Sequence, residues 1–407
     1  MSIRERLYPQ EQELPVLMRH CADARYVWNL GLEQRNYWAQ GHTQKITYNS
    51  QAHELSEARK NSWLKEGSSP IQQQALRDLD RAFKNWWRRP DHFGRPTWRK
   101  AGQHEGFYIR DLSVRRLNRK WGQVYVPKCG WVKFRITRKW SEVETASSAR
   151  VTLDRSGRWF VSFTRPASKL ERSTTDKAVG LDMGVTHTAT MSDGQFLDMP
   201  ALLSKGEQQR KRRLQRKLAR QTKGSNRRKA TKLAIAKISA REKDRRKDWI
   251  EKTTTSLVHD YDLIVLEDLK VKNMTRSAKG TVENPGKNVA QKSGLNRVIL
   301  SLGWSMFRKR LTDKANGATT PVEIIFVNPA YTSMRCSECG HMEPKNRKSQ
   351  ADFCCLKCGY TDNADLNAAK NILAAGHAVS GRGGTSQVKP DRAEHGDPTK
   401  RQPAEAA

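Results

Sequence analysis

The sequence predicts an α/β plus α+β fold: a helical module joined to a small β unit over the first 170 residues, then a mixed α/β domain. Three patterns support this prediction. Apolar residues recur with helical spacing near the N-terminus, alternate as in strands beyond residue 120, and form short apolar runs between helical segments beyond residue 176. Near the C-terminus, two C-x-x-C pairs predict a metal-binding ribbon.

The N-terminal helices are predicted over residues 15–37 and 70–89. In the second helix Leu76, Leu79, Phe83 and Trp87 fall on one stripe, and such a stripe normally faces a core. The stretch FGRPTWRK at 93–100 breaks the helical pattern. Beyond it, alternating apolar residues around the turn PKCG, and the segment VTLDRSGRWFVSF at 151–163, predict β-structure with hairpin turns.

The second domain is predicted from three apolar runs that are typical of strands: KAVGLDMGV at 177–185, DLIVLEDL at 262–269 and VEIIFV at 322–327. Between the first two runs, residues 204–258 predict two strongly basic helices with a break at KGSN, residues 223–226. Strands that alternate with helices in this way predict a mixed α/β domain.

The charge balance indicates a polyanionic partner. The chain carries 76 Lys and Arg against 42 Asp and Glu, a net charge of +34. A compact body with this charge repels itself unless a polyanion neutralises it, so we expect a nucleic acid. In the two basic helices the excess is too one-sided for salt-bridge pairing, which favours a surface that faces phosphates. A protein with a basic surface and no such partner is the simpler alternative.

The cellular compartment is predicted from the lack of two kinds of apolar segment. The sequence has no run of about 18 apolar residues, and no apolar signal segment follows MSIRERLYPQ. We therefore expect a cytoplasmic protein, in a compartment that keeps thiols reduced. Five of the seven cysteines lie within residues 336–358, and in a reducing compartment this clustering favours metal ligation over disulfides.

The cysteine cluster predicts a structural zinc ion. The two pairs are Cys336 with Cys339 and Cys355 with Cys358, at the spacing of a four-cysteine zinc ribbon. A glycine follows each pair and allows a tight backbone turn. This shared C-x-x-C-G pattern selects Cys355 over its neighbour Cys354. Four thiolates leave no open coordination position, so the predicted Zn²⁺ stabilises the fold.

Three acidic residues suggest a second kind of metal site. Asp182 and Glu267 follow apolar strand residues, where burial of unpaired carboxylates is costly unless cations lie between them. Asp365 begins DLNAAKNIL, where a helix N-cap is the simplest interpretation. Together the three acids can hold two Mg²⁺ or Mn²⁺ ions about 4 Å apart, as in phosphodiester hydrolysis by a ribonuclease H-like fold. Three nearby acids compete for these roles, and spacing alone does not rank them: Asp193, Asp268 and Asp362.

The order of motifs then resembles one family. GLDMGV at 180–185, IVLEDLKVKNM at 264–274, the cysteine pairs and DNADLNAAKNI at 362–372 resemble the RuvC-like nuclease of the transposon-associated TnpB proteins, relatives of type V CRISPR effectors. Softer matches extend the resemblance over residues 6–375: RLYP at 6–9, ARYVWN at 24–29, AFKNWW at 82–87 and VPKCGWVK at 126–133.

The resemblance implies an architecture of four parts. A wedge-like β barrel would occupy residues 1–175, with a helical recognition module inserted at about 12–100. A ribonuclease H-like (RuvC) nuclease domain would comprise residues 176–328 and 362–376, with the zinc ribbon inserted at 329–361. Beyond the residues that carry the resemblance, the Gly-, Pro- and Ser-rich composition of residues 377–407 predicts a disordered tail.

The resemblance also implies an activity, that of an RNA-guided DNA endonuclease in the bacterial or archaeal cytoplasm. Asp182, Glu267 and Asp365 would be the catalytic residues and hold the two Mg²⁺ or Mn²⁺ ions. The partners would be a guide RNA from the transposon end, with one protein copy per guide, and double-stranded target DNA beside a short motif. Tyr48 and Gln73 would read that motif. Other nucleic-acid contacts are expected from the basic helices: Arg212, Arg213, Arg216, Lys217, Arg227 and Arg228.

Three other functions use the same fold. A nuclease-inactive, RNA-guided repressor typically lacks one acid of the triad, whereas all three are present here. A transposase would join DNA ends, because ribonuclease H-like folds also serve transposition. A junction resolvase would act on four-way DNA without RNA.

Overall fold

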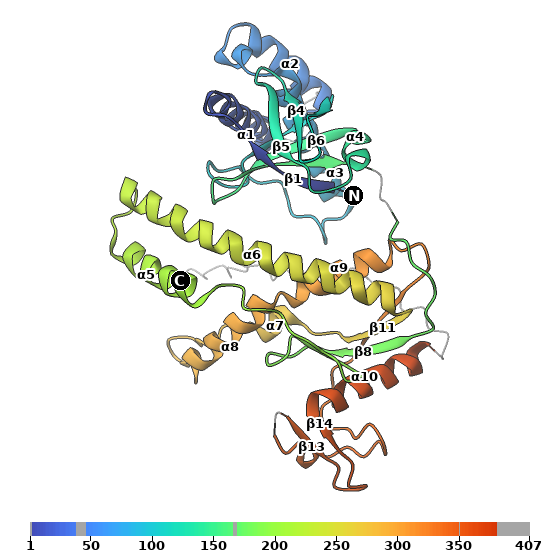
Figure 1. Cartoon of the computed structure of the whole chain (residues 1–407). Helices are drawn as coiled ribbons and strands as arrows, with labels where there is room; N and C mark the ends of the chain where they lie inside the picture. The colour runs from blue at the N-terminus through green and yellow to red at the C-terminus, as the bar shows by residue number, and fades with distance from the viewer. Residues whose placement is uncertain (1, 38–45, 166–168, 350, 381–407) are drawn as a thin grey trace, which may run out of the picture. The chain divides into compact units, whose positions relative to one another are not determined.

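The computed structural model describes residues 2–37, 46–165, 169–349 and 351–380 (Figure 1). These residues form two compact units, a first unit up to residue 165 and a second unit from residue 169. None of the described helices is both long enough and apolar enough to cross a membrane.

The first unit contains a seven-stranded antiparallel sheet in the order β2-β6-β7-β1-β5-β4-β3. Its strands are β1 (Ser2–Tyr8), β2 (Gly106–Ile109), β3 (Val114–Arg116), β4 (Trp121–Val126), β5 (Gly130–Arg135), β6 (Ser148–Leu153) and β7 (Trp159–Thr164). Alternate residues such as Leu7, Phe134 and Phe163 are fully buried in one core. Within the described residues the edge strands β2 and β3 do not pair with each other, so barrel closure stays a prediction.

Three longer helices accompany this sheet: α1 (Leu14–Tyr37), α2 (Tyr48–Lys60) and α3 (Ser69–Arg88). Short helical turns lie at Glu11–Glu13, Trp63–Glu66 and α4 (Trp140–Glu144). The predicted α3 stripe is buried at Leu76, Leu79 and Phe83, but the prediction is wrong for Trp87, which is 60% exposed. Trp87 lies in the last turn of the helix, beyond the surface that the core covers.

The second unit is mixed α/β, as predicted. Its sheet has the order β10-β9-β8-β11-β12, in which β8, β11 and β12 are parallel and β9 runs antiparallel to both of its neighbours, β8 and β10. The strands are β8 (Ala178–Asp182), β9 (Ala189–Met191), β10 (Phe196–Leu197), β11 (Leu263–Glu267) and β12 (Glu323–Val327). The helices are α5 (Lys205–Arg220), α6 (Asn226–Asp260), α7 (Val271–Met274), α8 (Val289–Leu302), α9 (Trp304–Ala315) and α10 (Ala364–Ser380).

Opposite faces of this sheet pack against different helices. Ile264 and Leu266 of β11 share a core with residues of α6 and α9, whereas Val265 packs with Ile372 of α10. Glycines allow α10 to approach closely, because a Cβ at Gly180 of β8 would lie 2.3 Å from the carbonyl oxygen of Ala369. Figure 1 shows α10 against β8 and β11, with the ribbon hairpin of β13 (Asp352–Cys354) and β14 (Thr361–Asn363) before it.

The ribbon lies between β12 and α10 in the chain and includes a short turn at Pro344–Asn346. Helix α10 continues to Ser380, past residue 377 where the disordered tail was predicted to begin. The extra residues are still helical because nothing in the sequence stops α10 at Gly376, which packs against Val265. The remainder of the predicted tail, 381–407, lies outside the described residues.

Candidate functional site

Strand alternation directs two of the predicted acids toward α10. Side chains two residues apart in a strand share a face. Asp182 therefore shares the face of Gly180, which contacts α10, and Glu267 shares the face of Val265, which also packs against α10. Because β8 and β11 are parallel neighbours, their carboxyl ends bring these two side chains to one edge of the sheet.

Asp365 joins them from the first turn of α10, and it is not the N-cap. The side chain of Asn363 caps the helix, since its Oδ1 accepts from the backbone N–H of Asp365 at 2.9 Å and of Leu366 at 3.1 Å. The carboxylate of Asp365 instead accepts a hydrogen bond from Arg347 Nη2 at 2.9 Å. We call Asp182, Glu267 and Asp365 the carboxylate cluster.

The carboxylates interact electrostatically. Burial, with the nearby charges of Glu267 and Asp365, raises the pKa of Asp182 to about 7, and only Arg347 opposes this shift. Burial also raises the pKa of Glu267, against the effect of a hydrogen bond from Thr332. Buried like charges of this kind are stabilised by a cation. The donor set of hard carboxylate oxygens fits Mg²⁺ or Mn²⁺.

The three competing acids have hydrogen-bond or ion-pair partners elsewhere in the protein. Asp268 pairs with Lys270 and Arg308, and Asp362 pairs with Lys370. Asp193 accepts from the Tyr261 hydroxyl at 2.7 Å and from its neighbour Gln195. Each of these carboxylates has an interaction that explains its presence without a metal.

Two further residues at this site were not predicted from the sequence. Arg347 lies in the ribbon and reaches Asp365. Thr332 lies after β12, and its hydroxyl donates to Glu267 Oε1 at 2.6 Å. Both contacts join residues far apart in the chain or in different elements, and no local pattern marks them.

The four cysteines meet as predicted. Their sulfurs lie within 4.8 Å of one another, with Cys336 to Cys358 at 3.7 Å and Cys339 to Cys355 at 3.6 Å. A tetrahedral zinc ion with Zn–S bonds of about 2.3 Å requires sulfurs about 3.8 Å apart, so the set fits structural Zn²⁺. Cys354 is not part of this four-cysteine site. Within the described residues, only these four cysteines bring potential metal-ligating atoms so close together. The carboxylate oxygens of Asp182, Glu267 and Asp365 are therefore more widely spaced than the four sulfurs.

The basic helices carry most of the predicted phosphate contacts on their surface. Arg212, Arg213, Arg216, Lys217 and Arg227 are exposed, and several line one hollow near the α5–α6 turn: Arg213, Arg216, Lys217, Arg220 and Arg227. Arg228 differs, because its guanidinium donates to the carbonyls of Leu218 and Gln221 and caps the C-terminal end of α5.

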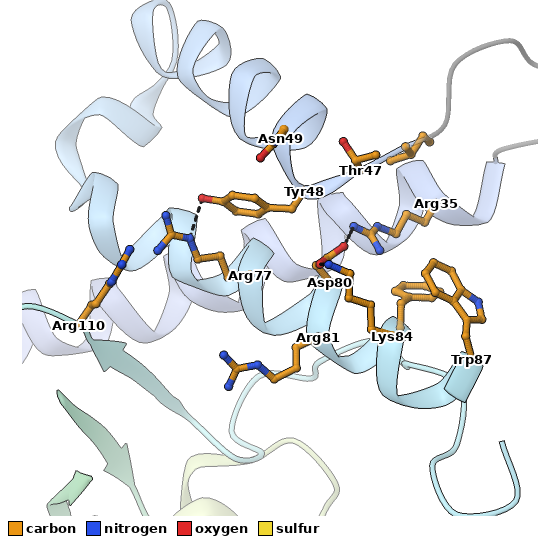
Figure 2. Close-up of a pocket in the computed structure, with 12 residues that line it drawn as sticks. Arg35, Thr47, Tyr48, Asn49, Arg77, Asp80, Arg81, Lys84, Trp87 and Arg110 are labelled. Carbon is orange, nitrogen blue, oxygen red and sulfur yellow. Dashed lines mark hydrogen bonds and ion pairs between the residues drawn. The ribbon is translucent and has the colours of Figure 1, made fainter. Parts of the chain in front are cut away.

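Tyr48 lines a pocket in the first unit (Figure 2). It is the first residue of α2, and its hydroxyl accepts from Arg77 Nε of α3 at 2.8 Å. Arg81, Lys84 and Arg110 also line the pocket, with Asp80 paired to Arg35 at 3.0 Å. Gln73 lies one helical turn before Arg77 on α3. Basic side chains beside aromatic rings are typical of surfaces that bind nucleotides, because the cations contact phosphates and the rings stack on bases.

Comparison with known proteins gave matches over nearly the whole chain. The model of a family described as "Probable transposase" (OrfB of IS605) matches residues 150–278, and that of the "Cas12f1-like, TNB domain" matches residues 304–372. The chain is 38% identical to "Putative RNA-guided DNA endonuclease InsQ" of Escherichia coli K12, over 99% of this chain and 97% of that protein. It is 31% identical to "Putative RNA-guided DNA endonuclease" of Streptomyces pristinaespiralis, over 96% and 92%. Among solved structures, the Cas12f1 protein in a complex with guide RNA and target DNA matches with 15% identity and a TM-score of 0.49, over 89% and 82% of the chains.

Proposed function

The chain belongs to the TnpB (IS605 OrfB) family of RNA-guided DNA endonucleases, and we propose that it cleaves double-stranded DNA selected by a bound guide RNA. One observation carries the proposal: three carboxylates from β8, β11 and α10 interact at one edge of a mixed sheet. Asp182, Glu267 and Asp365 would hold two Mg²⁺ or Mn²⁺ ions, which when bound supply an activated water and stabilise the leaving oxygen.

The surrounding chain supports this assignment. The strand order and directions of the second unit support a ribonuclease H-like (RuvC) nuclease, with the zinc ribbon between β12 and α10. Asp182 and Glu267 would bind metal through oxygens that the sheet holds in place. Arg347, from the ribbon, would hold Asp365 and present a positive charge beside the scissile phosphate.

The nucleic-acid contacts in the proposal use two surfaces. The exposed cations of the α5–α6 turn would bind phosphates of the guide RNA or of the RNA–DNA duplex, which a protein recognises by its backbone. The pocket beside Tyr48 would contact DNA next to the target, with Gln73 on the neighbouring helix. A closed wedge-like barrel in the first unit, one protein copy per guide, and the domain limits 1–175, 176–328 with 362–376, and 329–361 belong to the same proposal.

The experiment is co-expression of the chain with the DNA that flanks its gene, sequencing of the bound RNA, and cleavage of a plasmid library by the complex. We expect one discrete RNA and guide-dependent cleavage that Asp182→Ala removes. Absence of any bound RNA from an active enzyme would reject the proposal.

A transposase is the second candidate, because the matched family model is described by that activity. It would produce joined DNA ends in the same reactions, and an RNA-guided endonuclease would leave breaks that are not joined. Binding of guide and target without cleavage would instead indicate an RNA-guided repressor.

A further inference from the structure

The segment between β12 and the first zinc ligand, residues 328–335, links the two candidate metal sites; we call it the connector. At its centre the Thr332 hydroxyl donates to Glu267 Oε1 at 2.6 Å. The carbonyl oxygen of Pro329 lies 3.2 Å from the same hydroxyl. Since a hydroxyl has one proton, the nearer and negatively charged carboxylate is the stronger acceptor.

Two buried asparagines of α10 hold the connector in place. Asn371 Nδ2 donates to the carbonyls of Thr332 at 2.9 Å and Arg335 at 2.7 Å. Asn367 Nδ2 donates to Arg335 O at 2.8 Å, and its Oδ1 accepts from the N–H of Ser337 at 2.9 Å. Asn367 is completely buried and Asn371 is 7% exposed. Ser337 lies between Cys336 and Cys339, so the same helix that carries Asp365 fixes both the zinc knuckle and Thr332.

The backbone directly before Thr332 is strained. Tyr331 has a φ of 68°, a left-handed conformation that is unfavourable for a residue with a Cβ atom. The N–H groups of Met334 and Arg335 both donate to the Tyr331 carbonyl at 3.1 Å and close a turn there. A strained residue persists where its surroundings fix it, and this one lies beside the site where the chain turns toward Glu267.

We propose that Thr332 is a positioning residue of the nuclease: its hydroxyl orients Glu267 for metal binding, and the zinc ribbon and α10 together set the position of Thr332. The inference rests on the proposed function. The bond engages Oε1 and restricts rotation of the carboxylate, which leaves Oε2 in a defined direction. Partners that orient metal ligands in this way typically contribute about 10–100-fold to metal affinity or activity. The zinc ribbon therefore acts on the second metal site through the connector, besides stabilising itself.

The test compares Thr332→Val, which keeps the side-chain shape and removes the hydroxyl, with Thr332→Ser, which keeps the hydroxyl. Ser333→Ala is the matched control, because it removes a hydroxyl from the adjacent connector residue. Mn²⁺ is titrated into each full-length, zinc-loaded protein, and free Mn²⁺ is measured by electron paramagnetic resonance. Binding at the carboxylate cluster is defined as the Mn²⁺ binding that Glu267→Gln abolishes. Zinc content and melting temperature are recorded for each variant.

We expect Thr332→Val to retain its zinc and to bind Mn²⁺ about 10–100-fold more weakly, while Thr332→Ser and Ser333→Ala match the wild type. In guide-dependent cleavage, Thr332→Val should need correspondingly more Mg²⁺ for half-maximal rate and approach the wild-type rate at saturation.

Unchanged Mn²⁺ affinity in Thr332→Val would overturn the inference. So would a loss of affinity that accompanies zinc loss and that serine does not restore, because that result indicates only a structural role. A wild type without Glu267-dependent Mn²⁺ binding would overturn it too. A wild type that binds Mn²⁺ at this site but does not cleave with guide RNA would reject the proposed function, and the Mn²⁺ comparison would still decide the role of Thr332.

Discussion

The four-cysteine site and the carboxylate cluster both border the start of α10, and they are built in opposite ways. The cysteines lie within residues 336–358, and their sulfurs already meet at tetrahedral spacing. The carboxylates come from β8, β11 and α10, at positions 182, 267 and 365, and are held by the apolar core of the sheet. Local sequence forms the first site, whereas the tertiary fold forms the second.

This difference predicts what each metal does for the protein. A ribbon with few apolar residues depends on its zinc to fold. The carboxylate cluster is positioned by strands and a helix that pack in an apolar core. Burial, followed by the nearby charges of Glu267 and Asp365, raises the pKa of Asp182. Removal of the second metal should therefore stop cleavage and leave the fold intact.

Replacement of Asp182 should have the largest effect. We expect Asp182→Asn to reduce guide-dependent cleavage on the order of 10³-fold or more, because one ligand of the cluster is lost. The same change should raise the melting temperature of the metal-free protein, since it removes one of three like charges. The control is Asp193→Asn, which alters a competing acid in a turn. Equal loss of cleavage in both variants would mean that the assignment of the cluster is wrong.

Loss of a zinc ligand should come next. Cys336→Ser should lower the zinc content well below one ion per chain, increase proteolysis within residues 329–361 and abolish cleavage, because the ribbon unfolds. Cys354→Ser should retain zinc and activity, since Cys354 is outside the four-cysteine site. Metal analysis and limited proteolysis check both variants. Zinc binding that survives Cys336→Ser would contradict the assignment of the four zinc ligands, and so would zinc loss in Cys354→Ser.

Gly180 offers a way to disturb the carboxylate cluster without replacing a carboxylate or a zinc ligand. A Cβ there would lie 2.3 Å from Ala369 O and 2.7 Å from Leu373 N, so Gly180→Ala must displace α10 from the sheet. We expect a stability loss of about 1–3 kcal/mol and weaker Mn²⁺ binding, with zinc content unchanged. Gly206→Ala, in α5 with open space around it, is the control. If Gly180→Ala left Mn²⁺ binding unchanged, the dependence of the cluster on α10 would be rejected.

Arg347 should have the smallest effect on stability. Its pairing with Asp365 is mostly shielded from solvent, with side-chain exposures of 27% and 15%. We expect Arg347→Met to destabilise the metal-free protein by about 1–2 kcal/mol, because the cluster loses its nearest positive charge. Mn²⁺ should reduce this difference, because the ion supplies positive charge in its place. Calorimetric melting with and without Mn²⁺ tests this, and a difference that does not respond to the metal would count against it.

The sequence predicted the parts of the site that have local signals. The cysteine spacing predicted the zinc site outright, and apolar neighbours marked Asp182 and Glu267. Only the family resemblance favoured these two acids over Asp193, Asp268 and Asp362. The partners of the three competing acids are tertiary contacts, which no sequence pattern shows. Taken alone, Asp365 is most simply interpreted as a helix N-cap, and the family resemblance implied that it is the third acid. In the structure the side chain of Asn363 caps the helix.

The remaining residues depend on long-range contacts. Arg347 lies in a basic stretch without a distinguishing pattern, and Thr332 is identified only by where the connector passes. Helix α2 has few apolar residues, with Gln51 and Leu55 buried, so helical spacing did not predict it. Strand β1 alternates through Ile3, Glu5 and Leu7, and the buried Glu5, which Thr137 satisfies with two hydrogen bonds to Oε1, obscures the apolar pattern.

The two metal sites can be distinguished in an anomalous-difference electron density map of the protein crystallised with guide RNA, zinc and Mn²⁺, recorded at both metal edges. We expect zinc between the four cysteines and manganese bound by Asp182, Glu267 and Asp365. Manganese at Asp268 or Asp362, or an empty carboxylate cluster beside an occupied zinc site, would contradict it.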